Sequence, residues 1–279
     1  MINEDLFYQE AFKRNLGLLS AEEQKKIKKS KIAIVGLGGV GGVYLLSLIR
    51  VGVGNFHIAD FDVFELVNIN RQAGANINSL GETKTKTMKE MGREINPFVS
   101  IKIFPEGISK KNIDNFLEGV DLVIDGIDFF NIKDRLLLFR KAREHSIYAL
   151  TSAPVGFGAS LLTFAPKGMS FEEYFDIKEG MSEKEKLLSF GLGLTPSLIQ
   201  RKYFRPSSVN FSKKETPSSV VGTLLCANLI ACEAIKIILG KKIKSAPFSI
   251  HFDSYARKYK KTYFKKRIKK WLIKKIFLK

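Results

Sequence analysis

A glycine-rich loop, Gly36-Leu-Gly-Gly-Val-Gly41, contains the first residues whose types and spacing indicate chemistry. Its glycines, Gly36, Gly38, Gly39 and Gly41, follow a short apolar run and precede a segment with helical character. Glycines allow a tight turn, and they let backbone N–H groups approach a phosphate at the positive end of a helix. The loop therefore predicts a nucleotide site, but it leaves the nucleotide unidentified.

A carboxylate follows this loop at a spacing typical of ribose recognition. Asp60 lies 24 residues after Gly36, at the end of a second expected strand, residues 55–59. A carboxylate in this place accepts hydrogen bonds from ribose hydroxyls. The loop and Asp60 together fit ATP and NAD equally well.

The elements that must position these residues alternate along the chain. Short apolar runs predict buried strands at residues 31–35, 55–59, 99–104, 122–127 and 148–152, with helical patterns between them. We therefore expect an α/β fold of the Rossmann type. Its doubly wound, mostly parallel sheet would carry helices on both faces and be followed by a C-terminal extension.

Changes in composition divide the chain into segments. Residues 1–30 are expected to form a helical segment, and residues 31–256 a nucleotide-binding domain. Within that domain, residues 166–217 carry two short helical patterns between Gly and Pro residues, and we expect a crossover or insertion there. The apolar stretch 220–239 contains Asn228, Glu233 and Lys236, which fits a core helix better than a membrane span.

Positive charge is concentrated at the C-terminus. The chain has a net charge of +18, and residues 257–279 contain twelve of its 46 Lys and Arg residues and no Asp or Glu. In residues 263–279, apolar side chains fall near one helical face with lysines opposite. Such a basic amphipathic tail fits an anionic membrane surface or a nucleic acid, and it equally fits a basic helix that is unattached or docked on its own chain.

The cysteines exclude one class of site. Cys226 and Cys232 are the only two in the chain, and neither belongs to a Cys-x-x-Cys pair. A four-cysteine zinc site within one chain is therefore excluded. The first residues are too charged for a signal peptide, so a cytoplasmic protein is expected.

The segment after Asp60 distinguishes ATP from NAD through a resemblance. A GxGGxG loop, an Asp-x-Asp strand end, an Asn-x-x-Arg-Gln turn, a later Lys and an Asp-x-x-Asp strand end together resemble the ThiF/MoeB/HesA family, bacterial relatives of ubiquitin-activating enzymes. The chain provides these motifs as Gly36–Gly41, Asp60 and Asp62, Asn68, Arg71 and Gln72, Lys84, and Asp125 and Asp128. The resemblance covers residues 8–160 and resumes at 220–240.

The resemblance implies an activity and a role for each residue. Family members adenylate a carboxylate with ATP and Mg²⁺, giving an acyl-adenylate and pyrophosphate, and they are usually homodimers. By resemblance, Arg71 and Lys84 contact the phosphates, and Asp128 holds Mg²⁺. Arg14 would reach across the dimer to the γ-phosphate. The residues expected to bind the nucleotide are Asp60, which would hold the ribose, Asn68 and Gln72, which would shape the pocket, and also Asp62.

The chain also departs from the family. Residues 166–217, where a thioester-forming cysteine is expected, contain no cysteine, so we expect adenylation without a thioester. Phe129 replaces the asparagine expected after Asp128. The segment 153–158 resembles the small-residue turn that precedes the substrate channel.

Several alternatives remain open at this point. The carboxylate belongs to a peptide or protein C-terminus, to a small molecule or to a modified tRNA base. Phe129 and the missing cysteine also fit a non-catalytic nucleotide-binding protein. An NAD-dependent oxidoreductase is disfavoured by Arg71 and Lys84.

Overall fold

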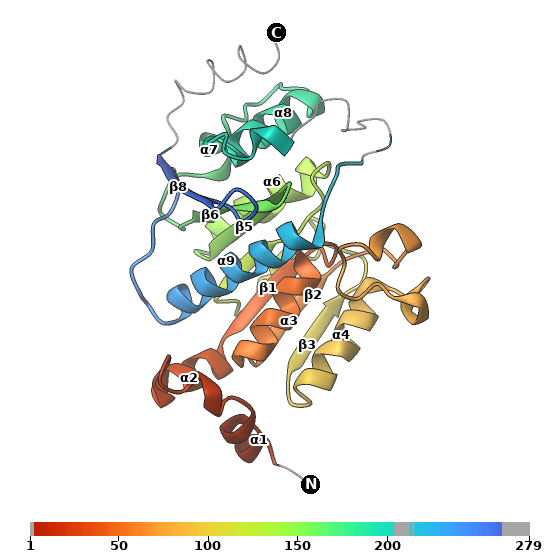
Figure 1. The fold of residues 1–279 in the computed structure, drawn as a ribbon, viewed down its shortest axis with the longest axis vertical. Helices are drawn as coiled ribbons and strands as arrows, with labels where there is room; N and C mark the ends of the chain where they lie inside the picture. The colour runs from red at the N-terminus through yellow and green to blue at the C-terminus, as the bar shows by residue number, and fades with distance from the viewer. Residues whose placement is uncertain (1–2, 204–212, 214, 264–279) are drawn as a thin grey trace.

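The computed structural model describes residues 3–203, 213 and 215–263, and within them eight strands form a single sheet (Figure 1). The strand order is β3-β2-β1-β4-β5-β6-β7-β8, and the pairs are parallel from β3 to β5 and antiparallel from β5 to β8. The strands are β1 (Lys31–Val35), β2 (Asn55–Ala59), β3 (Ser100–Phe104), β4 (Leu122–Asp125), β5 (Tyr148–Val155), β6 (Gly158–Phe164), β7 (Phe248–Asp253) and β8 (Lys258–Tyr263).

Helices cover both faces of the sheet, so the expected α/β fold with a mostly parallel sheet is confirmed. One face packs against α3 (Gly41–Val51), α4 (Lys84–Ile95) and α9 (Val220–Ile238). The other packs against α5 (Ile113–Phe116), α6 (Ile132–Glu144), α7 (Phe171–Phe175) and α8 (Glu183–Leu194). The remaining helical elements are α1 (Glu4–Ala11), α2 (Ala21–Lys29) and the short 3-10 turns η1 (Lys13–Asn15), η2 (Leu66–Asn68), η3 (Ile77–Ser79) and η4 (Arg201–Tyr203).

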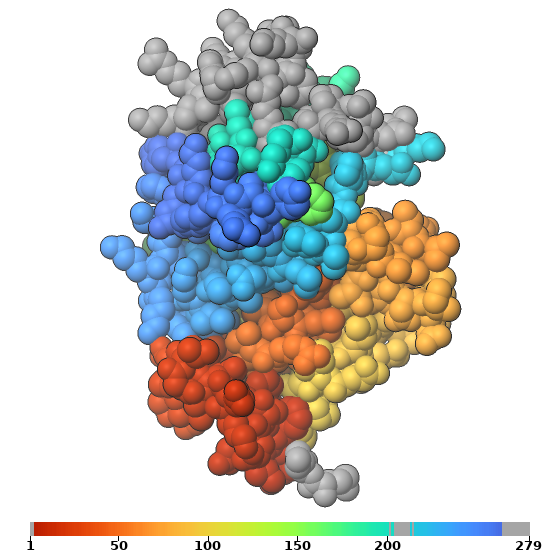
Figure 2. All heavy atoms as spheres, viewed as in Figure 1, coloured from red at the N-terminus to blue at the C-terminus, as the bar shows by residue number. Residues whose placement is uncertain are grey.

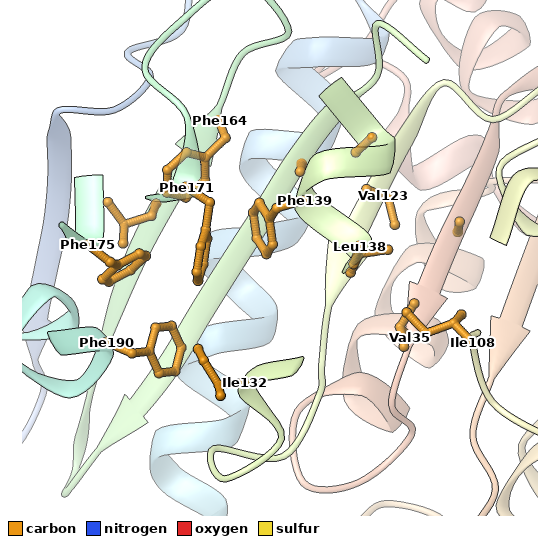
Figure 3. Packing of buried hydrophobic residues seen from close by; sticks show 14 of the residues in the cluster. Val35, Ile108, Val123, Ile132, Leu138, Phe139, Phe164, Phe171, Phe175 and Phe190 are labelled. Atoms are coloured by element: carbon orange, nitrogen blue, oxygen red, sulfur yellow. The ribbon is translucent and has the colours of Figure 1, made fainter. Parts of the chain in front are cut away.

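The two helical layers follow from alternation along the strands. In β1, Ile32 and Ile34 join the core beneath α3 and α9, whereas Ala33 and Val35 join the core beneath α6. Both faces of this strand are thus buried, which explains its continuous apolar run. The second core is rich in phenylalanine, and Figure 3 shows rings from α6, α7, α8 and β6 gathered together.

Residues 166–217 contain the two short helices expected from the sequence, α7 and α8. Both pack through aromatic rings: Phe171 lies 4.4 Å from Phe139 of α6, and Phe175 lies 4.9 Å from Phe190, measured between ring centroids. α7 and α8 are therefore part of the core layer on this face of the sheet.

α9 is long and apolar enough to pass for a membrane span. It lies on the sheet as a core helix, with Cys226, Ile230 and Ala234 fully buried. Its buried Glu233 accepts a hydrogen bond from the hydroxyl of Thr163, at 3.2 Å. This placement agrees with the core helix expected from the sequence.

Two elements differ from expectation. β5 continues to Val155 and β6 begins at Gly158, so the turn expected at residues 153–158 is confined to Gly156 and Phe157. Residues 258–263, expected to begin the basic tail, instead form β8 and pair with β7. The amphipathic helix expected beyond Tyr263 lies outside the described residues.

Candidate functional site

The strand order reverses between β1 and β4, and the glycine loop follows β1 at this point. β1 pairs with β2 on one side and with β4 on the other, and α3 begins at Gly41. In open α/β sheets, ligands bind in the crevice outside the carboxyl ends of the strands at such a reversal. The loop therefore lies at the binding crevice of the fold.

Backbone packing requires glycine at two positions of the loop. Gly36 has a φ of +82°, and a methyl group there would overlap the carbonyl of Gly126. A methyl group at Gly41 would overlap the carbonyl oxygen of Gly36. The loop therefore packs directly against the turn between β4 and α6, which carries Asp128 two residues after Gly126.

Asp60 fixes the shape of the loop. Its Oδ2 accepts a hydrogen bond from the backbone N–H of Leu37 at 2.5 Å, and its Oδ1 accepts one from Asp62 at 2.8 Å. Burial raises the pKa of the Asp60 carboxyl group, and the positive charge of Lys84 opposes that rise. A carboxylate oxygen can accept two hydrogen bonds, so the predicted ribose contact is compatible with the one bond that each Asp60 oxygen already accepts.

Lys84 places a fixed positive charge at the edge of the crevice. It is the first residue of α4, and its Nζ lies 2.9 Å from Oδ2 of Asp62. The Lys84 side chain is 7% exposed, whereas that of Asp62 is 52% exposed. Because the lysine is buried and held by its partner, little rotamer freedom remains to be lost on binding a phosphate.

The turn after η2 brings two more predicted residues to the loop. The carbonyl oxygen of Asn68 accepts hydrogen bonds from the N–H groups of Arg71 and Gln72, at 3.1 and 2.9 Å. The Asn68 side chain accepts another from Glu65, at 3.0 Å. This turn sets the side chain of Arg71 beside Gly39 and that of Gln72 beside Gly38.

Gln72 presents a buried polar atom with no hydrogen-bond partner among the described residues. Its side-chain amide nitrogen lies 3.7 Å from where a methyl group on Gly38 would be, and Oε1 is the unpartnered atom. A buried polar atom in this state costs about 1–3 kcal/mol. A hydrogen-bond donor from a bound nucleotide would remove that cost, so the site fits such a ligand.

Asp128 lies on the opposite side of the loop from Lys84. It is exposed, and its Oδ1 accepts a hydrogen bond from the N–H of Phe130 at 2.9 Å. Among the described residues, no cluster of three or more His, Cys, Asp or Glu side chains is placed to hold a metal ion. A single carboxylate fits Mg²⁺ all the same, because this ion is usually held by one or two carboxylates together with substrate phosphates and water.

Sequence reasoning missed Arg135, which holds the turn that carries Asp128. Its Nε lies 2.7 Å from Oδ2 of Asp125, and its guanidinium donates to the carbonyl oxygens of Ile127 and Asp128. The sequence feature that could have revealed this pair is an arginine in the first turn of α6, the helix that follows a strand ending in Asp125.

Phe129, which replaces the expected asparagine, packs away into the aromatic core. Its ring centroid lies 5.7 Å from that of Phe190 and 5.3 Å from that of Phe130. The substitution therefore adds a core contact next to Asp128.

The structure does not bring Arg14 to the crevice of its own chain. The neighbouring Asn15 donates a hydrogen bond to the carbonyl oxygen of Val51, the last residue of α3, whereas the glycine loop lies at the other end of that helix. Arg14 is exposed in η1. Its predicted reach into a partner subunit stays a prediction.

Two curated relatives share part of this chain. A tRNA threonylcarbamoyladenosine dehydratase of Haemophilus influenzae is 32% identical over 140 residues, which are 50% of this chain and 53% of the relative. A probable molybdopterin-synthase adenylyltransferase of Porphyra purpurea is 29% identical over 227 residues, which are 80% of this chain and 52% of the relative. The chain thus spans about half the length of these relatives.

A solved structure shares the fold. Escherichia coli MccB with ATP superposes with a TM-score of 0.64 at 20% identity, covering 86% of this chain and 66% of MccB. The sequence model of the ThiF family matches residues 12–270, which include the glycine loop, Arg71, Lys84 and Asp128. The resemblance drawn from these motifs is therefore confirmed, and the chain belongs to the ThiF family.

Proposed function

We propose that this chain catalyses the ATP-dependent adenylation of a substrate carboxylate. The observation that carries the proposal is the arrangement of four side chains about one glycine loop. Arg71 and Gln72 lie beside the loop. Lys84 pairs with Asp62, next to the Asp60 that holds the loop, and Asp128 follows the turn that packs on Gly36. A carboxylate oxygen would attack the α-phosphorus of ATP and form an acyl-adenylate, and pyrophosphate would leave with the electron pair of the broken P–O bond.

The proposed role of each residue follows from the charge of its side chain. Negative charge grows on the phosphate oxygens and on the leaving pyrophosphate, and fixed cations stabilise it at little cost in reorganisation. Lys84 is held in place by Asp62, and Arg71 by the carbonyl oxygen of Val67 at 3.1 Å. Asp128 would hold Mg²⁺ beside the phosphates, and Asp60 would keep the loop shaped for them.

Exchange of labelled pyrophosphate into ATP tests the proposal. We expect exchange that depends on one carboxylate substrate and falls roughly 10²- to 10³-fold in Lys84→Ala. Lys86→Ala is the matched control, because Lys86 lies on the same helix, is exposed and pairs with Glu82 at the surface. Carboxylate-dependent exchange that survives in Lys84→Ala would place the reaction elsewhere, and an absence of exchange would favour a non-catalytic nucleotide-binding protein.

A homodimer with shared sites is the second part of the proposal. Exposed apolar side chains, including Leu66, Val67, Val221 and Leu224, lie near the crevice and offer a surface for a second copy. Arg14 of one subunit would then complete the site of the other. An equal mixture of the inactive Arg14→Ala and Lys84→Ala variants should recover up to about a quarter of the parent activity. Half of the dimers in such a mixture are mixed, and one of the two sites in each mixed dimer is intact. Mixtures that stay inactive would contradict a shared site.

A carboxylate carried on RNA is the favoured substrate class among the alternatives. The relative from Haemophilus influenzae is named for a modified tRNA base. Comparing tRNA with peptides and small acids as the substrate that elicits exchange distinguishes the classes.

A further inference from the structure

Aromatic rings and exposed lysines line a strip of the molecule that begins at the turn between β5 and β6 and continues along both faces of β8. We call it the aromatic–lysine strip. Its members are Phe157, Lys202, Tyr203, Tyr255, Lys258, Tyr259, Lys260 and Lys261. Figure 2 shows the β7–β8 hairpin, in dark blue, on the same face of the molecule as α9, in lighter blue.

The first part of the strip is a cluster of three rings capped by a lysine. The ring of Phe157 lies 5.4 Å from both Tyr203 and Tyr255, measured between centroids. Nζ of Lys202 lies 4.7 Å from the centroid of Tyr203 and 5.3 Å from that of Tyr255. Tyr255 is 73% exposed, so a large part of its ring is open to a ligand.

Buried polar groups hold this cluster in place. The Tyr203 hydroxyl donates a hydrogen bond to Oδ1 of Asp253, a fully buried residue of β7, at 2.9 Å. The Ser254 hydroxyl donates to the carbonyl oxygen of Phe157 at 2.6 Å. The rings are therefore anchored to the end of the sheet and are preorganised for contact.

The second part of the strip follows β8. Lys258 and Lys260 pair in register with Asp253 and His251, whereas Tyr259 and Lys261 lie on the other face of the strand. Nζ of Lys261 lies 5.7 Å from the ring centroid of Tyr259, which is 54% exposed. Residues 254–263 contain no Asp or Glu. The acidic group next to the strip is the buried Asp253, whose Oδ2 lies 4.0 Å from Nζ of Lys202.

The strip leads to the glycine loop through the start of α9. The carbonyl oxygen of Gly156 accepts a hydrogen bond from Ser219, which caps α9, at 3.0 Å. Thr223, in the first turn of α9, has its methyl carbon 3.3 Å from the position that a methyl group on Gly39 would occupy. One end of the strip therefore lies a single helical turn away from the crevice.

We propose that the aromatic–lysine strip binds RNA that presents unstacked bases. Lysines contact phosphates, and exposed rings stack on bases of any sequence. Lysines on both faces of β8 leave no single apolar face to insert into a membrane, and a purely acidic peptide would use the lysines without the rings. That the strip guides an RNA-borne carboxylate to the crevice rests on the proposed function.

Salt-dependent binding of fluorescent unfractionated tRNA to the full chain tests the lysines. The variant Lys258→Gln/Lys260→Gln/Lys261→Gln should weaken binding and reduce the slope of log K against log salt by about 2–3, since each of the three lost phosphate contacts removes about 0.7–0.9. The control Lys25→Gln/Lys26→Gln/Lys29→Gln removes the same charge from exposed positions of α2. Equal effects of the two triple variants would overturn the proposal, because tRNA binding would then depend on the net charge of the protein and not on the position of the lysines.

The rings are tested separately at constant salt. Tyr255→Ala and Tyr259→Ala should each weaken tRNA binding by roughly fivefold or more and leave the salt slope unchanged, whereas Tyr255→Phe should bind like the parent chain. Full retention of binding in both alanine variants would overturn the proposal. The proposal would also be overturned if the Lys258→Gln/Lys260→Gln/Lys261→Gln variant lost binding to phosphatidylglycerol vesicles and kept its binding to tRNA.

Failure of this inference is distinguishable from failure of the adenylation. Lys84→Ala should lose pyrophosphate exchange and bind tRNA like the parent chain. Binding that depends on the strip, in a chain without exchange activity, would leave the RNA site standing and remove the adenylation. Pyrophosphate exchange in a chain that does not bind tRNA at the strip would support the adenylation and overturn the RNA site.

Discussion

Nε of Arg135 lies 2.7 Å from Oδ2 of Asp125, and the two side chains are only 3% and 1% exposed. The guanidinium carbon of Arg135 also lies 4.4 Å from the ring centroid of Phe190. This ion pair joins the end of β4 to the first turns of α6, so the intervening turn has a fixed path. Because that turn abuts the glycine loop and carries Asp128, a structural pair sets the geometry of the candidate site.

Breaking this pair should be costly. We expect Arg135→Ala to lower the free energy of unfolding by about 3–5 kcal/mol, because the Asp125 carboxylate would remain buried without its partner. Arg140→Ala is the control: its pair with Glu172 has an arginine side chain that is 60% exposed, and its loss should cost within about 1 kcal/mol. Urea denaturation measures both. Similar losses in the two variants would mean that Arg135 does not hold the turn.

The glycine loop offers a comparison between neighbouring positions. Gly41→Ala should unfold at a lower temperature and lose ATP binding, because the new methyl group would overlap the carbonyl oxygen of Gly36. Gly38→Ala should unfold like the parent chain, since its nearest neighbour, on Gln72, would lie at an ordinary 3.7 Å. Thermal unfolding with and without ATP measures the contrast, and normal ATP binding by Gly41→Ala would contradict the packing.

Removing the anchor of the loop should weaken both ATP binding and the stability of the fold. Asp60→Ala deletes the acceptor for the N–H groups of Leu37 and Asp62. Each lost hydrogen bond to a charged group costs about 1.5–3 kcal/mol, and we expect ATP affinity to fall at least tenfold by calorimetric titration. Asp121→Ala makes a control at the opposite end of the sheet, where Asp121 accepts from the N–H of Lys31. An Asp60→Ala variant with the parent's ATP affinity would show that the loop holds its shape without this anchor.

Stability should depend on pH through His251. Burial, helped by the charge of Lys260, lowers the pKa of this fully buried histidine to about 4. Since the unfolded chain titrates near 6.5, it binds the extra proton first as the pH falls. The contribution is therefore present above pH 6.5 and is lost between pH 6.5 and about 4, to a total of roughly 3 kcal/mol.

Urea unfolding at pH 7, 5.5 and 4 measures this effect. His251→Gln lacks the titrating group, so its stability should fall less steeply across the same window. His145→Gln serves as the control, because His145 is partly exposed and pairs with Asp114 at the surface. Identical profiles for the parent chain and His251→Gln would show that other groups govern the pH dependence.

Strands that are buried on both faces could be predicted from the sequence, whereas the edge strand β8 could not. β1 is apolar along nearly its whole length because both of its faces are covered, and its end at Gly36 is marked by the loop itself. β8 carries lysines at positions 258, 260 and 261, and its hydrogen bonds to β7 rather than buried side chains maintain it as a strand. Hydrophobic periodicity cannot reveal such a strand.

Those residues of the candidate site that belong to short sequence motifs could be predicted from the sequence. The sequence located Arg71, Gln72 and Lys84, and the structure places all three beside the loop or at its edge. Arg135 escaped because its partner lies ten residues away and neither periodicity nor a short motif marks their pairing. The position of Arg14 depends on a second subunit, which a single chain does not specify.

β8 is the last strand of the sheet, and within the described part of the chain no further strand pairs with its outer edge. An open strand edge is a template on which another molecule can add a strand, which is how folded proteins begin to aggregate. Lys258, Lys260 and Lys261 line this edge, and a second copy approaching it would meet like charge. The same lysines therefore disfavour edge-to-edge pairing between two folded copies.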